Sequence, residues 1–177
     1  MLRRHVENDN PAATRELGFA YERGRAGLVP SHKKAARHFK RAAELGDVTA
    51  MNSLGVCYTY GQGVKLDKKK AAKYYRMAAG RGYAAAQIKM GLFFERGIGV
   101  AQDLVESFRW YKLAADQGLT IAESKVGSMY AAYGDLGVAR DADEAADEAA
   151  RWFERAAAKG DGLARLRELQ RDRTRRS

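Results

Sequence analysis

The side chains best suited to nucleophilic or acid–base chemistry are sparse: the chain has three histidines and one cysteine. Ser31 and Lys34 have the spacing at which a lysine can activate a serine, but the S-D-N and K-T-G motifs that accompany this pair in penicillin-recognising enzymes are missing. His32 and His38 are six residues apart, which places them on different faces of a helix and argues against a metal pair. We therefore expect no catalytic residue, no metal site and no cofactor.

The remaining candidate motifs also have structural explanations. The pairs Gly61-x-Gly63 and Gly97-x-Gly99 lack the third glycine of a dinucleotide-binding loop, and neither follows a predicted strand. The acidic residues of segment 141–148 lack the spacing and the central glycine of a calcium loop. Cys57 has no second cysteine to pair with, so we expect a buried small hydrophobic residue rather than a disulfide.

The glycines belong to a pattern that occurs four times. Each copy contains an apolar residue followed by Gly, an aromatic residue three positions later, a glycine turn, an acid or Ser, two aromatic residues, alanines and a closing Gly. A period of 20–50 residues is typical of stacked repeats. The copies span Ala13–Gly46, Asp47–Gly82, Tyr83–Gly118 and Leu119–Gly160.

Each copy predicts two antiparallel helices. In the first half, apolar residues such as Ala50, Leu54 and Tyr58 recur at helical spacing, and the glycine turn then ends the helix. An N-cap residue is predicted at the start of each second helix, and a C′ glycine at its end. The N-cap residues are Ser31, Asp67, Asp103 and Asp141, and the C′ glycines are Gly46, Gly82, Gly118 and Gly160.

One glycine lies inside each first helix, where it costs about 1 kcal/mol relative to Ala. These glycines are Gly18, Gly55, Gly91 and Gly127. Since the cost recurs in every copy, we expect a packing reason, namely a neighbouring helix backbone that passes too close for a Cβ atom.

The pattern resembles the Sel-1-like repeat family, a branch of the tetratricopeptide-type helical solenoids. The residues that match its signature most closely are Gln62-Gly63-Val64, Asp67, Lys70-Ala71, Tyr74-Tyr75 and Ala78-Ala79, with Gly97-Ile98-Gly99-Val100, Asp103, Trp110-Tyr111, Lys112 and Ala114-Ala115 in the next copy. The resemblance implies an all-α fold, a right-handed α/α superhelical solenoid whose concave groove is lined by the first helices. It also implies an adaptor or scaffold for other proteins.

We therefore predict four repeats over residues 12–160, with the bounds 13–46, 47–82, 83–118 and 119–160. Residues 1–11 form a poorly ordered N-terminal segment, and residues 161–177 form a capping helix with a basic tail. Two copies depart from the pattern. The first has a longer turn with Pro30, and the fourth has 42 residues, of which four extra residues lengthen its second helix by about one turn.

The formal charge of +10 is unevenly distributed. The first two repeats carry about +5 each, the third 0 and the fourth −3. Such polarity favours an oriented encounter with an oppositely charged protein, or weak head-to-tail association of an otherwise monomeric chain. A pI near 9.8 also makes nucleic-acid binding an alternative function. It is less favoured because the aromatic residues of the repeat belong to its core.

We expect a partner to bind first-helix residues that lie off the core stripe, because an apolar strip rimmed by polar residues suits a peptide or helix. The positions are Arg15, Asn52, Ile88 and Ser124, then Phe19, Val56, Leu92 and Ser128, and one turn further Glu22, Thr59 and Glu95. The favoured function is a non-catalytic protein–protein interaction module. The alternatives are a toxin-neutralising partner of a secreted bacterial effector and a basic nucleic-acid-binding solenoid.

The N-terminal residues contain no apolar run, so the sequence predicts neither a signal peptide nor a membrane span. A cytoplasmic protein is expected, unless a signal sequence has been removed from the chain.

Overall fold

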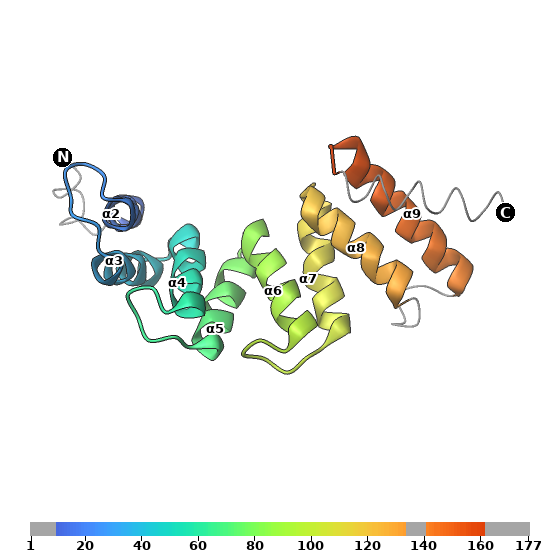
Figure 1. Ribbon diagram of the computed structural model, residues 1–177, viewed down its shortest axis with the longest axis horizontal. Coiled ribbons are helices and arrows are strands. Elements are labelled where there is room, and N and C mark those ends of the chain that lie inside the picture. Colours follow the sequence, from blue (N-terminus) through green and yellow to red (C-terminus); the bar gives the residue numbers. More distant parts are fainter. Residues whose placement is uncertain (1–9, 134–140, 162–177) are drawn as a thin grey trace. The chain divides into compact units, whose positions relative to one another are not determined.

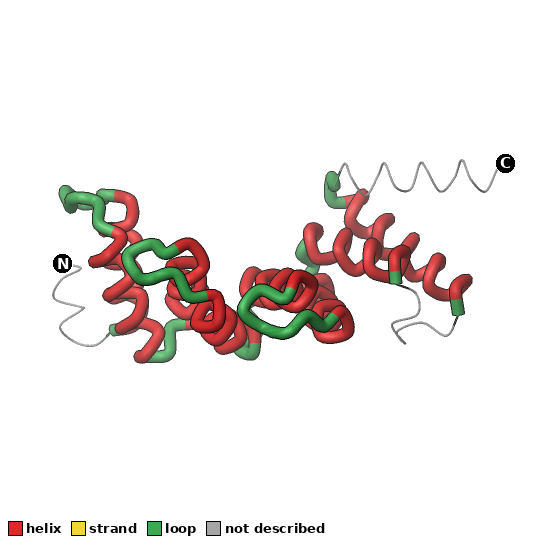
Figure 2. Tube along the Cα trace, turned by 60° about the horizontal axis from the view of Figure 1, so that its bottom comes forward, coloured by secondary structure: helices red, strands yellow, loops and turns green. Residues whose placement is uncertain are grey.

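Every regular element in the described part of the chain, residues 10–133 and 141–161, is an α-helix (Figures 1 and 2). The helices of this computed structural model are α2 (Pro11–Arg23), α3 (His32–Glu44), α4 (Val48–Tyr60), α5 (Lys68–Ala79), α6 (Ala84–Arg96), α7 (Leu104–Asp116), α8 (Thr120–Ala132) and α9 (Ala142–Ala158). They alternate as the first and second helices of four repeats, so the predicted all-α repeat fold is confirmed. None of these helices is long and apolar enough to cross a membrane.

The chain divides into two compact units, residues 1–102 and 103–177. The N-terminal unit contains α2 to α6, and the C-terminal unit contains α7 to α9. In the N-terminal unit each helix packs against the next one along the chain, and in the C-terminal unit α8 packs between α7 and α9.

All four predicted N-caps of the second helices are confirmed. The Ser31 hydroxyl accepts from the Lys34 amide at 3.3 Å, and the carboxylates of Asp67, Asp103 and Asp141 accept from the amide three residues later at 2.8–2.9 Å. Each bond satisfies an amide that has no partner within its helix. Ser31 therefore acts as a cap, which explains its spacing from Lys34 without catalysis.

The closing glycines also adopt the predicted geometry. Gly46, Gly82, Gly118 and Gly160 all have positive φ, between 82° and 93°. The amide that follows each glycine donates back to an alanine carbonyl of the second helix, as from Asp47 to Ala42 at 2.9 Å. This is the Schellman arrangement, which explains why glycine and alanine recur together at these ends.

Three of the four glycines inside the first helices make room for a ring, and our expectation of a close helix backbone is wrong at Gly18 and Gly55. A Cβ atom at these two positions would lie 2.6–2.7 Å from ring carbons of the second helix in the same repeat. At Gly127 the nearest ring carbons would be at 2.9 Å, and the Ala149 carbonyl oxygen would also lie at 3.1 Å. The glycine–ring pairs are Gly18 with Phe39, Gly55 with Tyr75, and Gly127 with Phe153.

The second glycine of each G-x-G turn lies against the preceding repeat. A Cβ atom at Gly63 would lie 2.0 Å from the His32 carbonyl oxygen, and one at Gly99 would lie 2.3 Å from that of Lys68. Both glycines also have positive φ, 72° and 69°. Each turn therefore packs directly on the first residue of the previous second helix, a contact that only glycine permits.

Other sequence predictions fall partly outside the described residues. Helix α9 has 17 residues where the other second helices have 12 or 13, so the extra turn of the fourth repeat is present. The turn segment 134–140 and the predicted capping helix within 162–177 are not described. At the other end, α2 begins at Pro11 with Asn10 as its N-cap, two residues before the repeat bound that we predicted.

Candidate protein-binding surface

The first helices are largely buried, and one stripe of each remains accessible. On α4 this stripe consists of Asn52, Val56 and Tyr60, which lie four residues apart on one helix face. Asn52 and Val56 are half-buried and Tyr60 is 64% exposed, whereas Leu54 and Gly55 between them are buried. The predicted interaction surface is thus narrow, because Asn52 and Val56 are partly covered by the fold.

The predicted apolar row, Phe19, Val56 and Leu92, lies on α2, α4 and α6 of the N-terminal unit. All three side chains are half-buried. The Phe19 ring packs edge-on against Phe39 with centroids 5.0 Å apart, and the Arg23 guanidinium lies 5.3 Å from its centroid. Phe19 is therefore held by the core, and all three apolar side chains of the row keep part of their surface accessible.

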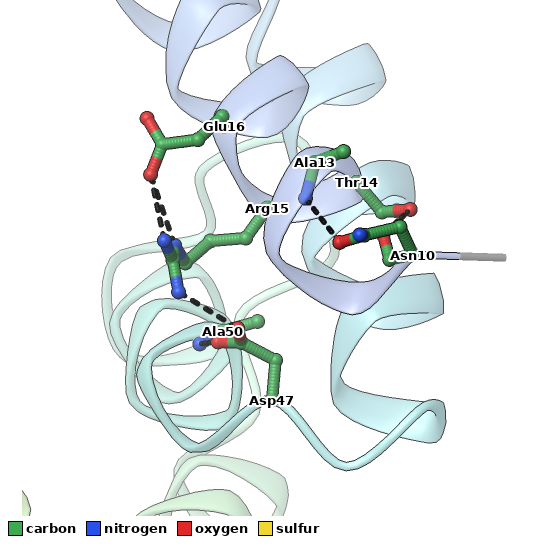
Figure 3. Close-up of polar contacts among 7 residues, drawn as sticks. All are labelled: Asn10, Ala13, Thr14, Arg15, Glu16, Asp47 and Ala50. Atoms are coloured by element: carbon green, nitrogen blue, oxygen red, sulfur yellow. Dashed lines mark hydrogen bonds and ion pairs between the residues drawn. The ribbon is translucent and has the colours of Figure 1, made fainter. Parts of the chain in front are cut away.

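The position two residues before the apolar–Gly pair links successive repeats. Arg15 on α2 donates to Asp47 at 2.8 Å, and Asp47 also accepts from the Ala50 amide at 2.7 Å as the N-cap of α4 (Figure 3). The guanidinium also pairs with Glu16 at 2.8 Å. Arg15 therefore holds the start of the next repeat, and its role in partner binding stays a prediction.

The fourth repeat contains the same link. The Ser124 hydroxyl bonds to the Asp161 carboxylate, and Asp161 follows a closing glycine just as Asp47 does. In the second repeat the corresponding residue is Tyr83, which offers no carboxylate, and the buried Oδ1 atom of Asn52 has no hydrogen-bond partner.

Thr59 does not lie on the accessible surface where we expected it. Its side chain is buried, and its hydroxyl bonds to the Gly55 carbonyl at 2.8 Å and to the Tyr75 hydroxyl at 3.3 Å. The next residue, Tyr60, is exposed instead. Counting four residues on from Val56, the spacing of one helix face, would have found Tyr60.

The other predicted residues are half-buried and make local contacts. Glu22 lies 3.9 Å from the Arg23 guanidinium, and the Glu95 carbonyl accepts from Gln102 at 2.8 Å. Ser128 donates to the Ser124 carbonyl at 2.7 Å, so its hydroxyl is used within α8. Ile88 is half-buried on α6. An exposed residue that we missed is Ile121 at the start of α8, which is 66% accessible.

A family model described as Sel1 repeat matches residues 11–47, 48–83, 84–119 and 120–161. The chain belongs to the Sel1 repeat family. The members of this family are generally interaction scaffolds rather than enzymes, which agrees with the sparse chemistry of this sequence.

Solved structures give the same result for this Sel1 repeat protein. A protective antigen of uropathogenic Escherichia coli with an SLR fold is 35% identical, with a TM-score of 0.86 over 96% of this chain and 35% of that one. A Sel1 repeat protein from Oxalobacter formigenes is 33% identical, with a TM-score of 0.81 over 92% of this chain and 62% of that one. The chain thus spans about a third and about three fifths of these two relatives. No curated protein matches the chain.

A more distant structure shows the fold alone. The cysteine-rich protein B of Helicobacter pylori is 24% identical, with a TM-score of 0.55 over 68% of this chain and 91% of that one.

The cysteine here, Cys57, is a buried thiol, as predicted, and burial raises its pKa to about 11. A thiol with so high a pKa is a poor nucleophile, since the thiolate is the reactive form.

The Sel1 repeat protein also contains a buried carboxylate that sequence reasoning did not single out. Glu123 on α8 is 0% exposed and pairs with Lys159 at 2.8 Å and Arg155 at 3.2 Å. Lys159 also donates to the Gly118 carbonyl at 3.0 Å, which joins the end of α9 to the closing glycine of the third repeat. Among the described residues no group of three His, Cys, Asp or Glu side chains is arranged to hold a metal ion. We therefore interpret Glu123 as a structural ion-pair centre.

Proposed function

We propose that this Sel1 repeat protein is a non-catalytic interaction module that holds a segment of a partner protein against α2, α4 and α6. The observation that carries the proposal is the row of Phe19, Val56 and Leu92, which are apolar, partly accessible and fixed on three first helices of one compact unit. Tyr60 extends the row along α4 and adds an exposed aromatic side chain, a residue type enriched at protein interfaces.

The flanking charges support a peptide ligand. Glu22 and Arg23 lie one turn from Phe19, and Glu95 and Arg96 lie one turn from Leu92. An apolar strip with charged ends can bind an extended or helical segment through its apolar side chains and orient it through its charges. The expected cytoplasmic location is part of this proposal.

The test is a pull-down from nuclease-treated lysate with the tagged protein, at about 0.15 M and about 0.5 M salt, read by mass spectrometry. We expect one protein to be retained at both salt concentrations by the wild type and lost with Val56→Arg and with Leu92→Arg. Val29→Arg is the matched control, because Val29 is 80% exposed in the turn of the first repeat and outside the row.

Two results would contradict the proposal. The first is retention of the same protein by Val56→Arg and Leu92→Arg after circular dichroism has shown both variants to be folded. The second is recovery of nucleic acid and ribosomal proteins alone, lost at the higher salt concentration, which would favour the nucleic-acid alternative. A tight, stoichiometric complex with one secreted effector would specify the module as a toxin-neutralising partner.

A further inference from the structure

The second helices differ sharply in charge, whereas their buried residues are alike. Helix α3 carries five Lys and Arg residues and one Glu, and α5 carries five Lys and Arg residues and no acid. In the C-terminal unit, α7 carries two basic and two acidic residues, and α9 carries two basic and five acidic residues. The excess on α3 and α5 exceeds what local acids can neutralise, so it is available to a ligand of opposite charge.

Helices α3 and α5 lie next to each other in the N-terminal unit. Gly63, in the turn before α5, packs on the His32 carbonyl at the start of α3. At the other end of α3, the Glu44 carboxylate is close enough to contribute to the raised pKa of Tyr74 on α5, after the larger effects of burial and Tyr58. We call the exposed Lys and Arg residues of α3 and α5 the basic face.

The basic face contains a cleft of about 640 Å³ over α3. It is lined by Lys34, Arg37, Lys40 and Arg41, with Glu44 at one end and Tyr21 of α2 and His38 at its wall. Lys40 pairs with Glu44 at 3.9 Å, so one carboxylate is already held among these cations.

The aromatic rings along the basic face are already covered by neighbours. Tyr21 and His38 stack with centroids 5.4 Å apart and an interplanar angle of 4°, and the Lys34 ammonium lies 5.2 Å from the Tyr21 centroid. Tyr58 and Tyr74 stack in the same way at 5.6 Å and 3°. Single-stranded nucleic acid binds by stacking its bases on accessible rings, so these engaged rings favour a polypeptide ligand.

The spacing of the cations fits an extended chain. Residues three and four apart on a helix, such as Lys34, Arg37 and Arg41, lie about 6 Å apart. Side chains at every second position of an extended peptide are about 6.6 Å apart and point the same way. Alternate Asp or Glu residues would therefore meet successive cations along α3, and the Arg37 guanidinium can bind a carboxylate through two bonds.

We propose that the basic face is a second binding surface, which holds an extended acidic segment of a partner protein in the cleft over α3. It is independent of the apolar row on the first helices. Because α9 is acidic, a second copy of this chain is the natural competing occupant; however, the acids of α9 lie on a regular 17-residue helix, which offers no extended chain to the cations of α3. The segment of another protein is therefore the favoured ligand.

The experiment measures fluorescence anisotropy of a labelled twelve-residue peptide of alternating Glu and Ser at about 0.05 M salt. We expect saturable binding, with affinity falling at least about tenfold in the double variant Lys34→Glu, Arg37→Glu. Both side chains are exposed, and a glutamate in the first turn of α3 is favoured by the helix dipole, so this variant should fold. The double variant Arg25→Glu, Lys65→Glu makes the same charge change at two exposed turn residues of the unit, outside both proposed surfaces, and should lose less than about threefold.

Several outcomes would overturn the proposal. Equal affinity for the matching Gln–Ser peptide, or equal losses in the two double variants, would mean that no specific acidic site exists on α3. Tighter binding of a short DNA duplex, with the same sensitivity to Lys34→Glu and Arg37→Glu, would assign the face to nucleic acid. A wild-type oligomer in analytical ultracentrifugation that dissociates in the Lys34→Glu, Arg37→Glu variant would assign it to a second copy. Peptide binding unchanged by Val56→Arg is expected, and its loss in that folded variant would show that the two surfaces are one.

Discussion

Replacing Gly55 by Ala tests the packing rule of the repeat. The added Cβ atom would lie 2.7 Å from two ring carbons of Tyr75 and 3.0 Å from a third, whereas carbon atoms in contact prefer about 3.5–4.0 Å. The ring would have to move by about 1 Å, and Tyr75 is 0% exposed. Its hydroxyl bond with Thr59 would be strained at the same time.

The two opposing contributions can be compared. Overpacking a close-packed core costs about 1–3 kcal/mol. Replacing Gly by Ala inside a helix contributes about 1 kcal/mol in the other direction. Because the Tyr75 hydroxyl bond is also strained, we expect overpacking to exceed the helix gain, and Gly55→Ala to lower the free energy of unfolding by about 1–2 kcal/mol. This corresponds to roughly 3–6 °C in Tm for a chain of this length.

The assay is urea and thermal unfolding followed by circular dichroism, with Gly80→Ala as the control. Gly80 follows α5 with a helical φ of −65°, and the nearest atom to an added Cβ is the Arg76 carbonyl oxygen at 3.3 Å. We expect Gly80→Ala to be neutral or slightly stabilising. In a double-mutant cycle, Tyr75→Leu should recover part of the loss caused by Gly55→Ala. A Gly55→Ala protein as stable as the wild type, with no coupling to Tyr75→Leu, would refute the glycine–ring explanation.

Three further predictions concern the glycine turns, His38 and the ion pairs of Glu123. Gly63→Ala should lower the free energy of unfolding by about 3 kcal/mol or more, because its Cβ would lie 2.0 Å from a carbonyl oxygen and its φ is positive. Gly46→Ala has open space around the added Cβ, so it should cost only the roughly 1–2 kcal/mol of a left-handed residue. Urea unfolding measures both. Burial, and then the neighbouring Arg37 guanidinium, lower the pKa of His38. The contribution of His38 to stability is therefore complete above about pH 6.5 and falls as the pH drops below that value. His38→Gln should remove this fall from a plot of Tm against pH, and an unchanged plot would contradict the prediction. Lys159→Met should destabilise more than Glu123→Gln in thermal unfolding. Lys159→Met leaves a fully buried carboxylate with Arg155 as its remaining cation, whereas Glu123→Gln leaves two half-exposed cations that water can solvate. A larger loss from Glu123→Gln would refute this reasoning.

Local chemistry made the helix ends predictable. Ser31 and Asp67 could be identified as N-caps because a cap depends on residues within one turn, and the closing glycines because positive φ selects glycine. The reason for Gly55 was not predictable in the same way. The sequence shows that a small residue is needed, but which atoms of a distant helix approach it depends on how two helices pack.

The candidate surface was predictable only in part, for a related reason. Helical spacing placed Val56 on an accessible stripe, yet the same counting put Thr59 there, although its hydroxyl bonds into the core. The link from Arg15 to Asp47 joins residues 32 positions apart, and no local pattern announces it. Such contacts between repeats decide which polar positions remain for a partner.

The contacts of Gly63 and Gly99 with the backbone of the preceding second helix have a consequence for how the protein can change. These main-chain and glycine contacts set the register between neighbouring repeats, so the outward residues of a second helix contribute little to it. Substitutions of outward residues can then change the charge of a second helix from strongly basic, as in α5, to acidic, as in α9, while the packing between repeats is kept. The binding specificity of such a repeat can therefore change through the outward residues of its second helix, while the glycine contacts between repeats stay the same.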